Sequence, residues 1–311
     1  MLARLLVVTG QVATLFILIG VGFVMGRIKQ ITSAGTKEMS NLLMNVVILC
    51  VIVDSFQNAA YDPSFLEILG TAIGVLILCY VLRAVMVQFL FRKEGDAMRP
   101  CLRFGCMYGN TGFMGIPLVA AVLGDGARIF AVVSMLVLNT AIWSHGTAMM
   151  GGRSSISVKK IVLSPGVMGA VIGIPLFLAQ VKLPGALGNA VGFLGDLNTG
   201  LAMVIIGAQM ARTDLLSTFR DGKLYAAAAV KLIVLPLMTA AILLLLPIQF
   251  EFNFFVAIVI LSGAPCAGIT SMMAEKYGKD AERSAQLVSL SNLLSIVTLP
   301  VVTVLAETLA G

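Results

Sequence analysis

Ten apolar stretches, each long enough to cross a lipid bilayer, follow one another along the chain and restrict its fold more than any other feature. A bilayer-spanning helix needs about 20 consecutive apolar residues. Ten of them in 311 residues leave only short connections and no separate soluble domain. The stretches cover residues 5–26, 38–57, 65–91, 100–123, 127–149, 161–180, 186–210, 224–246, 252–275 and 282–308. The sequence therefore predicts an all-α polytopic membrane protein with ten transmembrane helices.

Charged residues make up only 12% of the chain, whereas a soluble domain carries about 25%. This scarcity excludes a soluble globular protein, and the 59% hydrophobic content excludes a disordered one. A net charge of +6 would suggest nucleic acid as the partner of a soluble protein. Here the expected partner is the lipid bilayer, because cytoplasmic loops of membrane proteins carry excess Lys and Arg.

The positions of the 21 Lys and Arg residues predict the topology. Sixteen fall in the odd-numbered connections, whereas only Arg4, Arg128 and Lys182 fall at the chain ends or in even-numbered connections, one of which has its turn signal at Asp62-Pro63. The positive-inside rule therefore places the odd connections in the cytoplasm and both termini outside the cell (inner or plasma) membrane.

Enzyme and metal signatures are weak. The five cysteines form no CxxC pair, and a single histidine, His145, cannot build a multi-histidine metal site. Gly195-Asp196 lacks the second catalytic aspartate of an intramembrane protease, and no Walker motif occurs. We expect neither an enzyme nor a resident cofactor or metal.

The chain divides near Gly151 into residues 1–150 and 151–311, each with five predicted spans. An odd number of spans makes the second half enter the membrane opposite to the first, which is the inverted-repeat plan of many secondary transporters. Pro117 and Pro265 lie 148 residues apart, and so do the intramembrane cations Arg83 and Lys231. These two coincidences favour an internal duplication.

Glycine and proline interrupt the fourth and ninth spans, at residues 108–117 and 261–268, and we expect Pro117 and Pro265 to meet where the two breaks lie. Proline lacks an N–H group and glycine weakens a helix, so both helices should break near the membrane midplane. Broken backbone at that depth has to be packed in protein or line a cavity. Two kinked helices without a ligand are the plainer alternative, but a matched pair in opposed halves favours a binding site.

The run from Asn110 to Leu118 resembles the helix-4 signature of the auxin efflux carrier family, which includes plant PIN-type carriers and bacterial organic-acid permeases. Residues 264–278, 289–291 and 298–300 resemble that family's C-terminal pattern. The likeness covers essentially the whole chain. Two positions depart from it: Leu49 and Gly200 stand where many members have proline in helices 2 and 7.

The resemblance implies a fold related to the bile-acid/sodium symporters, with a scaffold and a transport domain each drawn from both repeats. Helices 4 and 9 would cross at their breaks, and an organic anion, such as a mono- or dicarboxylate or an auxin-like acid, would bind beside the crossing. It further implies elevator-type alternating access and a homodimer. The breaks and the resemblance together predict substrate contacts from Asn110, Thr111, Gly112, Gly115, Ile116, Pro117, Asn139, Gly263, Pro265, Cys266, Ala267 and Gly268.

Five further charged or titratable side chains have two interpretations each. Arg83 and Lys231 either extend toward an interface or pair locally, or they supply charge, to a substrate carboxylate or in place of a sodium ion. Asp54 and Asp196 either face the outer interface or carry a proton. His145 is either a packed side chain or a proton relay. Coupling to a proton and coupling to sodium are both compatible with this set.

The sequence thus predicts a secondary transporter of small organic anions. A sodium-coupled symporter of the bile-acid type is the alternative, and an anion channel is a weaker one because channels usually repeat a pore element around an axis. Glycines spaced by four residues, such as Gly22/Gly26, Gly70/Gly74 and Gly169/Gly173, predict close helix packing.

Overall fold

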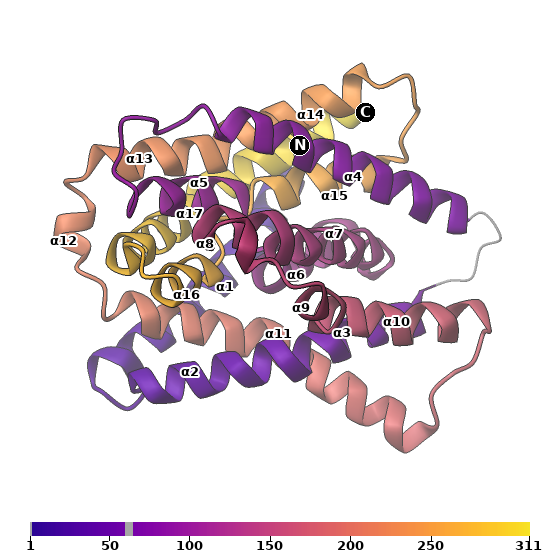
Figure 1. Cartoon of the computed structure of the whole chain (residues 1–311). Helices are drawn as coiled ribbons and strands as arrows, with labels where there is room; N and C mark the ends of the chain where they lie inside the picture. The colour runs from indigo at the N-terminus through magenta and orange to yellow at the C-terminus, as the bar shows by residue number, and fades with distance from the viewer. Residues whose placement is uncertain (1, 60–64) are drawn as a thin grey trace.

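The computed structural model describes residues 2–59 and 65–311, and the regular elements of this part of the chain are all helices (Figure 1). The turn predicted at Asp62-Pro63 lies outside the described residues, as does the side chain of Arg4. The helices of the first half are α1 (Leu2–Arg27), α2 (Ser33–Leu42), α3 (Ile48–Asn58), α4 (Phe65–Val87), α5 (Arg99–Met107), α6 (Ile116–Leu123), α7 (Arg128–Ala141) and α8 (Thr147–Gly151). Those of the second half are α9 (Val158–Val162), α10 (Pro165–Leu178), α11 (Gly185–Met210), α12 (Leu215–Thr218), α13 (Gly222–Ala229), α14 (Leu235–Leu245), α15 (Phe252–Ser262), α16 (Ile269–Lys276) and α17 (Ala281–Ala310).

Seven stretches of the described residues are long and apolar enough to cross a membrane. They are Thr9–Arg27, Ser33–Asn58, Glu67–Val87, Arg128–Gly151, Gly185–Met210, Gly222–Leu245 and Ala281–Ala310. Three shorter apolar helices, at Thr111–Leu123, Pro165–Leu178 and Phe252–Ser262, fall within the remaining predicted spans. They are short because the fourth and ninth spans are broken and because Pro165 starts a new helix after Ser164. The prediction of an all-α multi-pass membrane protein is confirmed.

Several spans contain a π-helical turn, the wider helix form that often marks functional sites. These turns are η1 (Leu43–Val47), η2 (Thr111–Gly115), η4 (Ile142–Gly146) and η6 (Val230–Val234). The second span therefore leaves regular α-helical geometry just before Leu49, although proline is missing there. By contrast, α11 runs through Gly200 without interruption.

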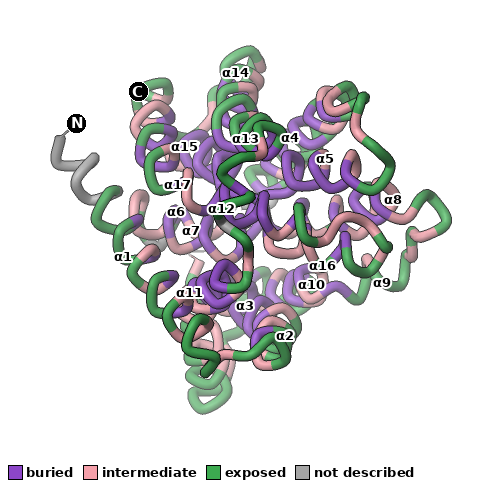
Figure 2. Tube along the Cα trace, turned by 90° about the vertical axis from the view of Figure 1, so that its left-hand side faces the viewer, coloured by how far each residue is buried: buried purple, intermediate pink, exposed green. Residues whose placement is uncertain are grey.

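The helices form two groups that pack mainly within themselves. We call α1, α2, α3, α10 and α11 the scaffold group, and α4 to α8 with α13 to α17 the crossover group. In Figure 1, α2, α3, α10 and α11 lie along the lower part of the view, beneath α5, α13, α14 and α17. Figure 2 shows the buried segments gathered in the middle, with exposed residues along the outer helices such as α1 and α14.

Glycines hold the scaffold group together. A Cβ atom on Gly207 of α11 would overlap the backbone oxygen of Ile19 in α1, and one on Gly26 would lie 2.8 Å from the Cβ of Ala211. Gly169 of α10 packs against Ile52 of α3 in the same way, with 2.9 Å for a Cβ there. The small residues therefore let backbones approach closely, as in other membrane helix pairs. Gly70 and Gly74 do not pack in this way, since a Cβ on either would meet nothing within 4 Å.

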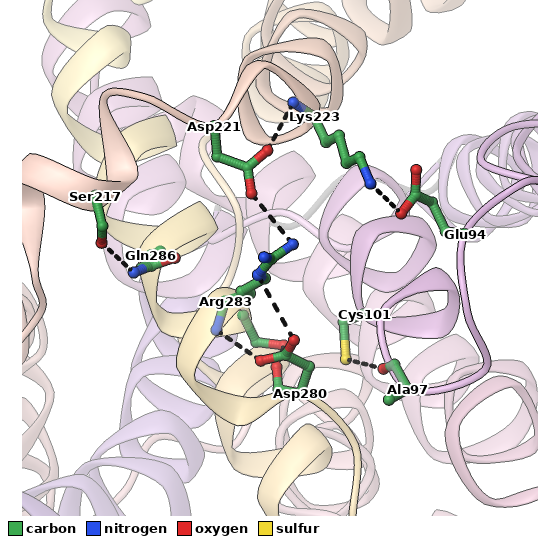
Figure 3. Close-up of polar contacts among 10 residues, drawn as sticks. Glu94, Ala97, Cys101, Ser217, Asp221, Lys223, Asp280, Arg283 and Gln286 are labelled. Atoms are coloured by element: carbon green, nitrogen blue, oxygen red, sulfur yellow. Dashed lines mark hydrogen bonds and ion pairs between the residues drawn. The ribbon is translucent and has the colours of Figure 1, made fainter.

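The connections predicted to be cytoplasmic contact one another at one end of the molecule. Figure 3 shows Lys223 paired with Glu94 at 2.8 Å and Arg283 paired with Asp221 at 3.3 Å. The N–H group of Asp280 also donates to the Ala97 carbonyl at 3.3 Å. Exposed ion pairs add little stability individually. Together these contacts join the ends of α4, α13 and α17, so they tie the crossover group into one body at this end.

The close approach of α1 and α11 makes a testable prediction for stability. Gly207→Ala should lower the melting temperature of the detergent-solubilised protein, because backbone atoms cannot move aside and overpacking costs about 1–3 kcal/mol. Gly70→Ala is the matched control: its Cβ meets nothing, and alanine is favoured over glycine in a helix by about 1 kcal/mol. Equal melting temperatures for the two variants would contradict the packing described here.

Candidate functional site

The fourth and ninth spans break and cross each other inside the crossover group. Helix α5 ends at Met107 and α15 at Ser262. Between the half-helices, Gly109 and Cys266 form an isolated antiparallel bridge. The N–H of Asn110 donates to the carbonyl of Pro265 at 2.7 Å, and the N–H of Ala267 donates to the carbonyl of Tyr108 at 3.1 Å. The two breaks therefore satisfy each other's backbone groups, which hydrocarbon could not do.

Further groups complete this crossing. Cys266 donates its N–H to the hydroxyl of Ser291 on α17 at 3.0 Å. The carbonyl of Asn110 accepts the N–H groups of Met114 and Gly115, both at 3.2 Å, and so starts η2. The predicted breaks in spans four and nine are thus confirmed.

The prediction that Pro117 and Pro265 meet at the crossing is wrong. The fourth span breaks at residues 108–110, and Pro117 is the second residue of α6, beyond η2. A proline is tolerated in the first turn of a helix, where few N–H groups have an intrahelical partner. The partner of the Pro265 segment is therefore the Tyr108–Asn110 segment, so the spacing of 148 residues does not superimpose the two breaks.

A cavity of about 80 Å³ lies against the crossing, between η2 and the scaffold helices. Its wall is mostly apolar, with side chains such as Ile48, Met135 and Ile205. Two helix starts face it, at Thr111 of η2 and at Gly268-Ile269 of α16. The positive N-terminal ends of helices attract anions, so this crossing pocket has an electropositive wall made of backbone.

Six of the predicted site residues line the crossing pocket, namely Asn110, Thr111, Gly112, Asn139, Ala267 and Gly268. The hydroxyl of Thr111 is buried and has no hydrogen-bond partner among the described residues. The other six do not line this pocket. Ile116 and Pro117 line a separate cavity, whereas Gly115 packs on Leu261 and Gly263 packs on Val302. Pro265 and Cys266 form the backbone hydrogen bonds of the crossing itself.

Two larger hollows lie at the ends of the boundary between the two helix groups. One, of about 1070 Å³, opens among the predicted cytoplasmic connections and shares Ser40, Gln209 and Met272 with the crossing pocket. We call it the vestibule. At its rim the backbone N–H of Ser217 lowers the pKa of the exposed Asp214, which keeps this carboxylate charged.

The other hollow, which we call the outer cavity, measures about 280 Å³ and lies toward the opposite end. It is lined by Asp54, Asp196 and Arg128 together with Pro117. The lining residues described for the outer cavity include none of those that line the crossing pocket. Asp196 is exposed, and Asp54 is half-buried and accepts a hydrogen bond from Asn58 at 3.0 Å.

Arg83 and Lys231 do not extend to an interface, but each pairs locally inside the crossover group. They are only 4% and 1% exposed. Arg83 donates to the hydroxyl of Thr239 and lies over the ring of Tyr80, 5.3 Å from its centroid. Lys231 donates to the carbonyl of Ser262, the last residue of α15, at 2.7 Å. It faces the negative C-terminal end of a broken helix rather than the crossing pocket.

Lys231 and Gly109 fit closely together at the crossing. A Cβ on Gly109 would lie 2.8 Å from the ammonium nitrogen of Lys231 and 3.0 Å from the carbonyl oxygen of Ala264. A Cβ here would displace the buried ammonium group, which glycine avoids. On the other side of the crossing, the phenol oxygen of Tyr108 lies 2.8 Å from Nδ1 of His145, whose side chain is otherwise exposed.

Two polar side chains outside the predicted substrate contacts also line these spaces. Gln209 of α11 lines both the crossing pocket and the vestibule, and Asn198 of the same helix lines the outer cavity. Both are polar positions in an apolar span, a signal that the sequence offered. Asn198 also directly precedes the Thr199-Gly200-Leu201-Ala202 stretch that departs from the family's helix-7 pattern.

Comparison with known proteins agrees with this architecture. A family model described as "Membrane transport protein" matches residues 7–159 and 153–303. The chain is also similar to an uncharacterized transporter of Methanothermobacter thermautotrophicus, with 22% identity over 297 residues that cover 94% of this chain and 96% of the relative. The chain therefore belongs to the membrane transport protein family, the auxin efflux carrier family that its motifs resemble, and is a membrane transporter.

Proposed function

We propose that this transporter is a secondary active carrier of small organic anions and that it binds them in the crossing pocket. The supporting observation is the set of polar groups that face this mostly apolar pocket. Two helix N-termini and the polar side chains of Asn110, Thr111 and Asn139 face a largely apolar space. Among the described lining residues there is no Lys or Arg, so backbone dipoles would hold the anionic head.

This pocket suits a carboxylate attached to an apolar body. The carboxylate would lie against the starts of η2 and α16, and the body would pack on side chains such as Met135 and Ile205. A monocarboxylate with one apolar end would place its charge against the helix starts and its apolar end against the apolar side chains. A dicarboxylate would bury its second charge among apolar side chains, which is costly without a partner.

The proposed arrangement in the membrane combines ten spans in two inverted repeats, 1–150 and 151–311, with the scaffold and crossover groups drawn from both. The odd connections would lie in the cytoplasm and both termini outside the cell membrane. The vestibule then opens to the cytoplasm and the outer cavity to the outside. Movement of the crossover group along the scaffold group would expose the pocket to each side in turn, and the scaffold group would form the homodimer contact.

For coupling, we propose that Lys231 replaces a sodium ion. In many carriers the C-terminal ends of broken helices coordinate Na⁺. Here the ammonium group of Lys231 already binds the carbonyl that ends α15. This contact favours a sodium-independent carrier over the sodium-coupled alternative and leaves the proton as the candidate coupling ion. Asp54 in the outer cavity is the carboxylate placed to carry it.

The first functional prediction concerns Asn110. Asn110→Ala should abolish the thermal stabilisation that organic acids give the purified protein, because it removes the amide beside the start of η2. The measurement is a thermal-shift screen of monocarboxylates of increasing apolar length. Asn45→Ala is the control, since the exposed Asn45 amide donates only to the Asn41 carbonyl of its own span. Unchanged ligand stabilisation of a folded Asn110→Ala protein would refute the assignment of the pocket.

The second functional prediction concerns Lys231. Uptake by the wild-type protein in liposomes should be the same in sodium and in choline buffers, whereas Lys231→Gln should lose most of its uptake. Glutamine removes the charge that faces the end of α15. Sodium-dependent uptake by the wild type would overturn the assigned role. If Lys231→Gln transports at the wild-type rate, the charge of Lys231 is not needed and its role is limited to packing.

A further inference from the structure

The carbonyl of Gly112 loses its helical donor because of Pro117. Toward the end of η2 the N–H groups bond carbonyls five residues earlier: that of Gly115 bonds Asn110, and that of Ile116 bonds Thr111. The next donor in this register would be the N–H of residue 117, which proline lacks. Gly112 is buried, so its carbonyl requires another partner.

Asn198 supplies that partner from the other helix group. Its side-chain Nδ2 donates to the Gly112 carbonyl at 2.9 Å. Asn198 belongs to α11 of the scaffold group, whereas Gly112 belongs to η2 of the crossover group. The bond therefore spans the boundary along which the two groups would slide.

This bond lies on the closed side of the crossing pocket, between the pocket and the outer cavity. Gly112 lines the crossing pocket and Asn198 lines the outer cavity, so the bonded pair lies between these two spaces. On the opposite side the pocket shares lining residues with the vestibule. Breaking the bond would remove one of the contacts that separate the pocket from the outer cavity.

The oxygen of the same side-chain amide is in an unfavourable position, because it is a buried acceptor that is left unsatisfied among the described residues. The Oδ1 of Asn198 is buried without a hydrogen-bond partner among the described residues, and the residue is 4% exposed. A buried acceptor without a partner is costly, which offsets part of what the Nδ2 bond contributes. The contact is therefore suited to break and form again rather than to hold permanently.

We propose that Asn198 is a positioning residue: its bond to the carbonyl freed by Pro117 holds the crossover group in the vestibule-open state and closes the outer side of the pocket. This inference rests on the proposed alternating access. It assigns a paired role to two residues on different helix groups, the donor Asn198 and the proline that makes its acceptor available.

The test compares the accessibility of two introduced cysteines in ligand-free protein reconstituted in nanodiscs. Ala285→Cys reports on the vestibule, whose wall Ala285 lines. Val51→Cys reports on the outer cavity, where Val51 is 9% exposed. The five native cysteines are all buried, and labelling of the protein without the introduced cysteines gives their background rate with a bulky polar maleimide.

Asn198→Ala should lower the labelling rate at Ala285→Cys and raise it at Val51→Cys, changing their ratio at least threefold. Pro117→Ala should change it in the same direction, because residue 117 then has an N–H that competes for the Gly112 carbonyl. The double variant should show no more than the larger single effect, since both changes break one bond.

Asn292→Ala is the matched control. Asn292 is also a buried asparagine whose Nδ2 donates to one carbonyl and whose Oδ1 has no partner among the described residues, but its bond to Val288 stays within α17. An unchanged labelling ratio in folded Asn198→Ala protein, or an equal change in Asn292→Ala, overturns the proposal. If Asn198→Ala does not fold, an unchanged ratio in Pro117→Ala overturns it.

The outcome is separate from the identity of the substrate. Labelling uses no ligand, so a changed ratio together with failed organic-anion binding would retain the role of Asn198 and reject the proposed substrate. An unchanged ratio together with normal organic-anion binding would do the reverse.

Discussion

The backbone pairing of Tyr108–Asn110 with Pro265–Ala267 is the interaction on which the rest of the structure depends. Each segment leaves its helix at a depth where water cannot take over its hydrogen bonds. An unsatisfied backbone group in hydrocarbon costs several kcal/mol. Neither break would be stable alone, but two breaks that cross satisfy each other through two backbone bonds. The half-helices that result can then point their ends at a ligand.

The crossing also separates opposite charges. The N-terminal ends of η2 and α16 face the crossing pocket, whereas the C-terminal end of α15 faces Lys231. The cation therefore neutralises the negative end without occupying the pocket. The proposed anion, held by helix ends and amides, would meet no Lys or Arg among the described residues that line the pocket, so its binding would be favourable while its release remained fast. A carrier needs both properties, since its substrate has to leave on the far side.

The parts of the fold that depend on local composition were predictable from the sequence. Hydropathy located the spans, and glycine with proline located the fourth and ninth as broken. The break in the fourth span lies within the predicted residues 108–117 but not at Pro117, because proline is tolerated at the start of α6 and the break lies where the Pro265 segment can pair. The burial of Arg83 and Lys231, and the contact of Asn198 with Gly112, depend on which helices face each other. A single sequence carries little information about that.

The cavities along the boundary between the helix groups favour a carrier over a channel. A pore requires a continuous path, yet the crossing pocket joins the vestibule on one side and is separated from the outer cavity by the contact of Asn198 with Gly112. In the proposed mechanism, opening the far side would require the crossover group to shift relative to the scaffold group. That shift would also move the paired backbone segments and the pocket beside them, because they belong to one group of helices. Each passage of substrate would then need one conformational cycle, which is the behaviour of a carrier.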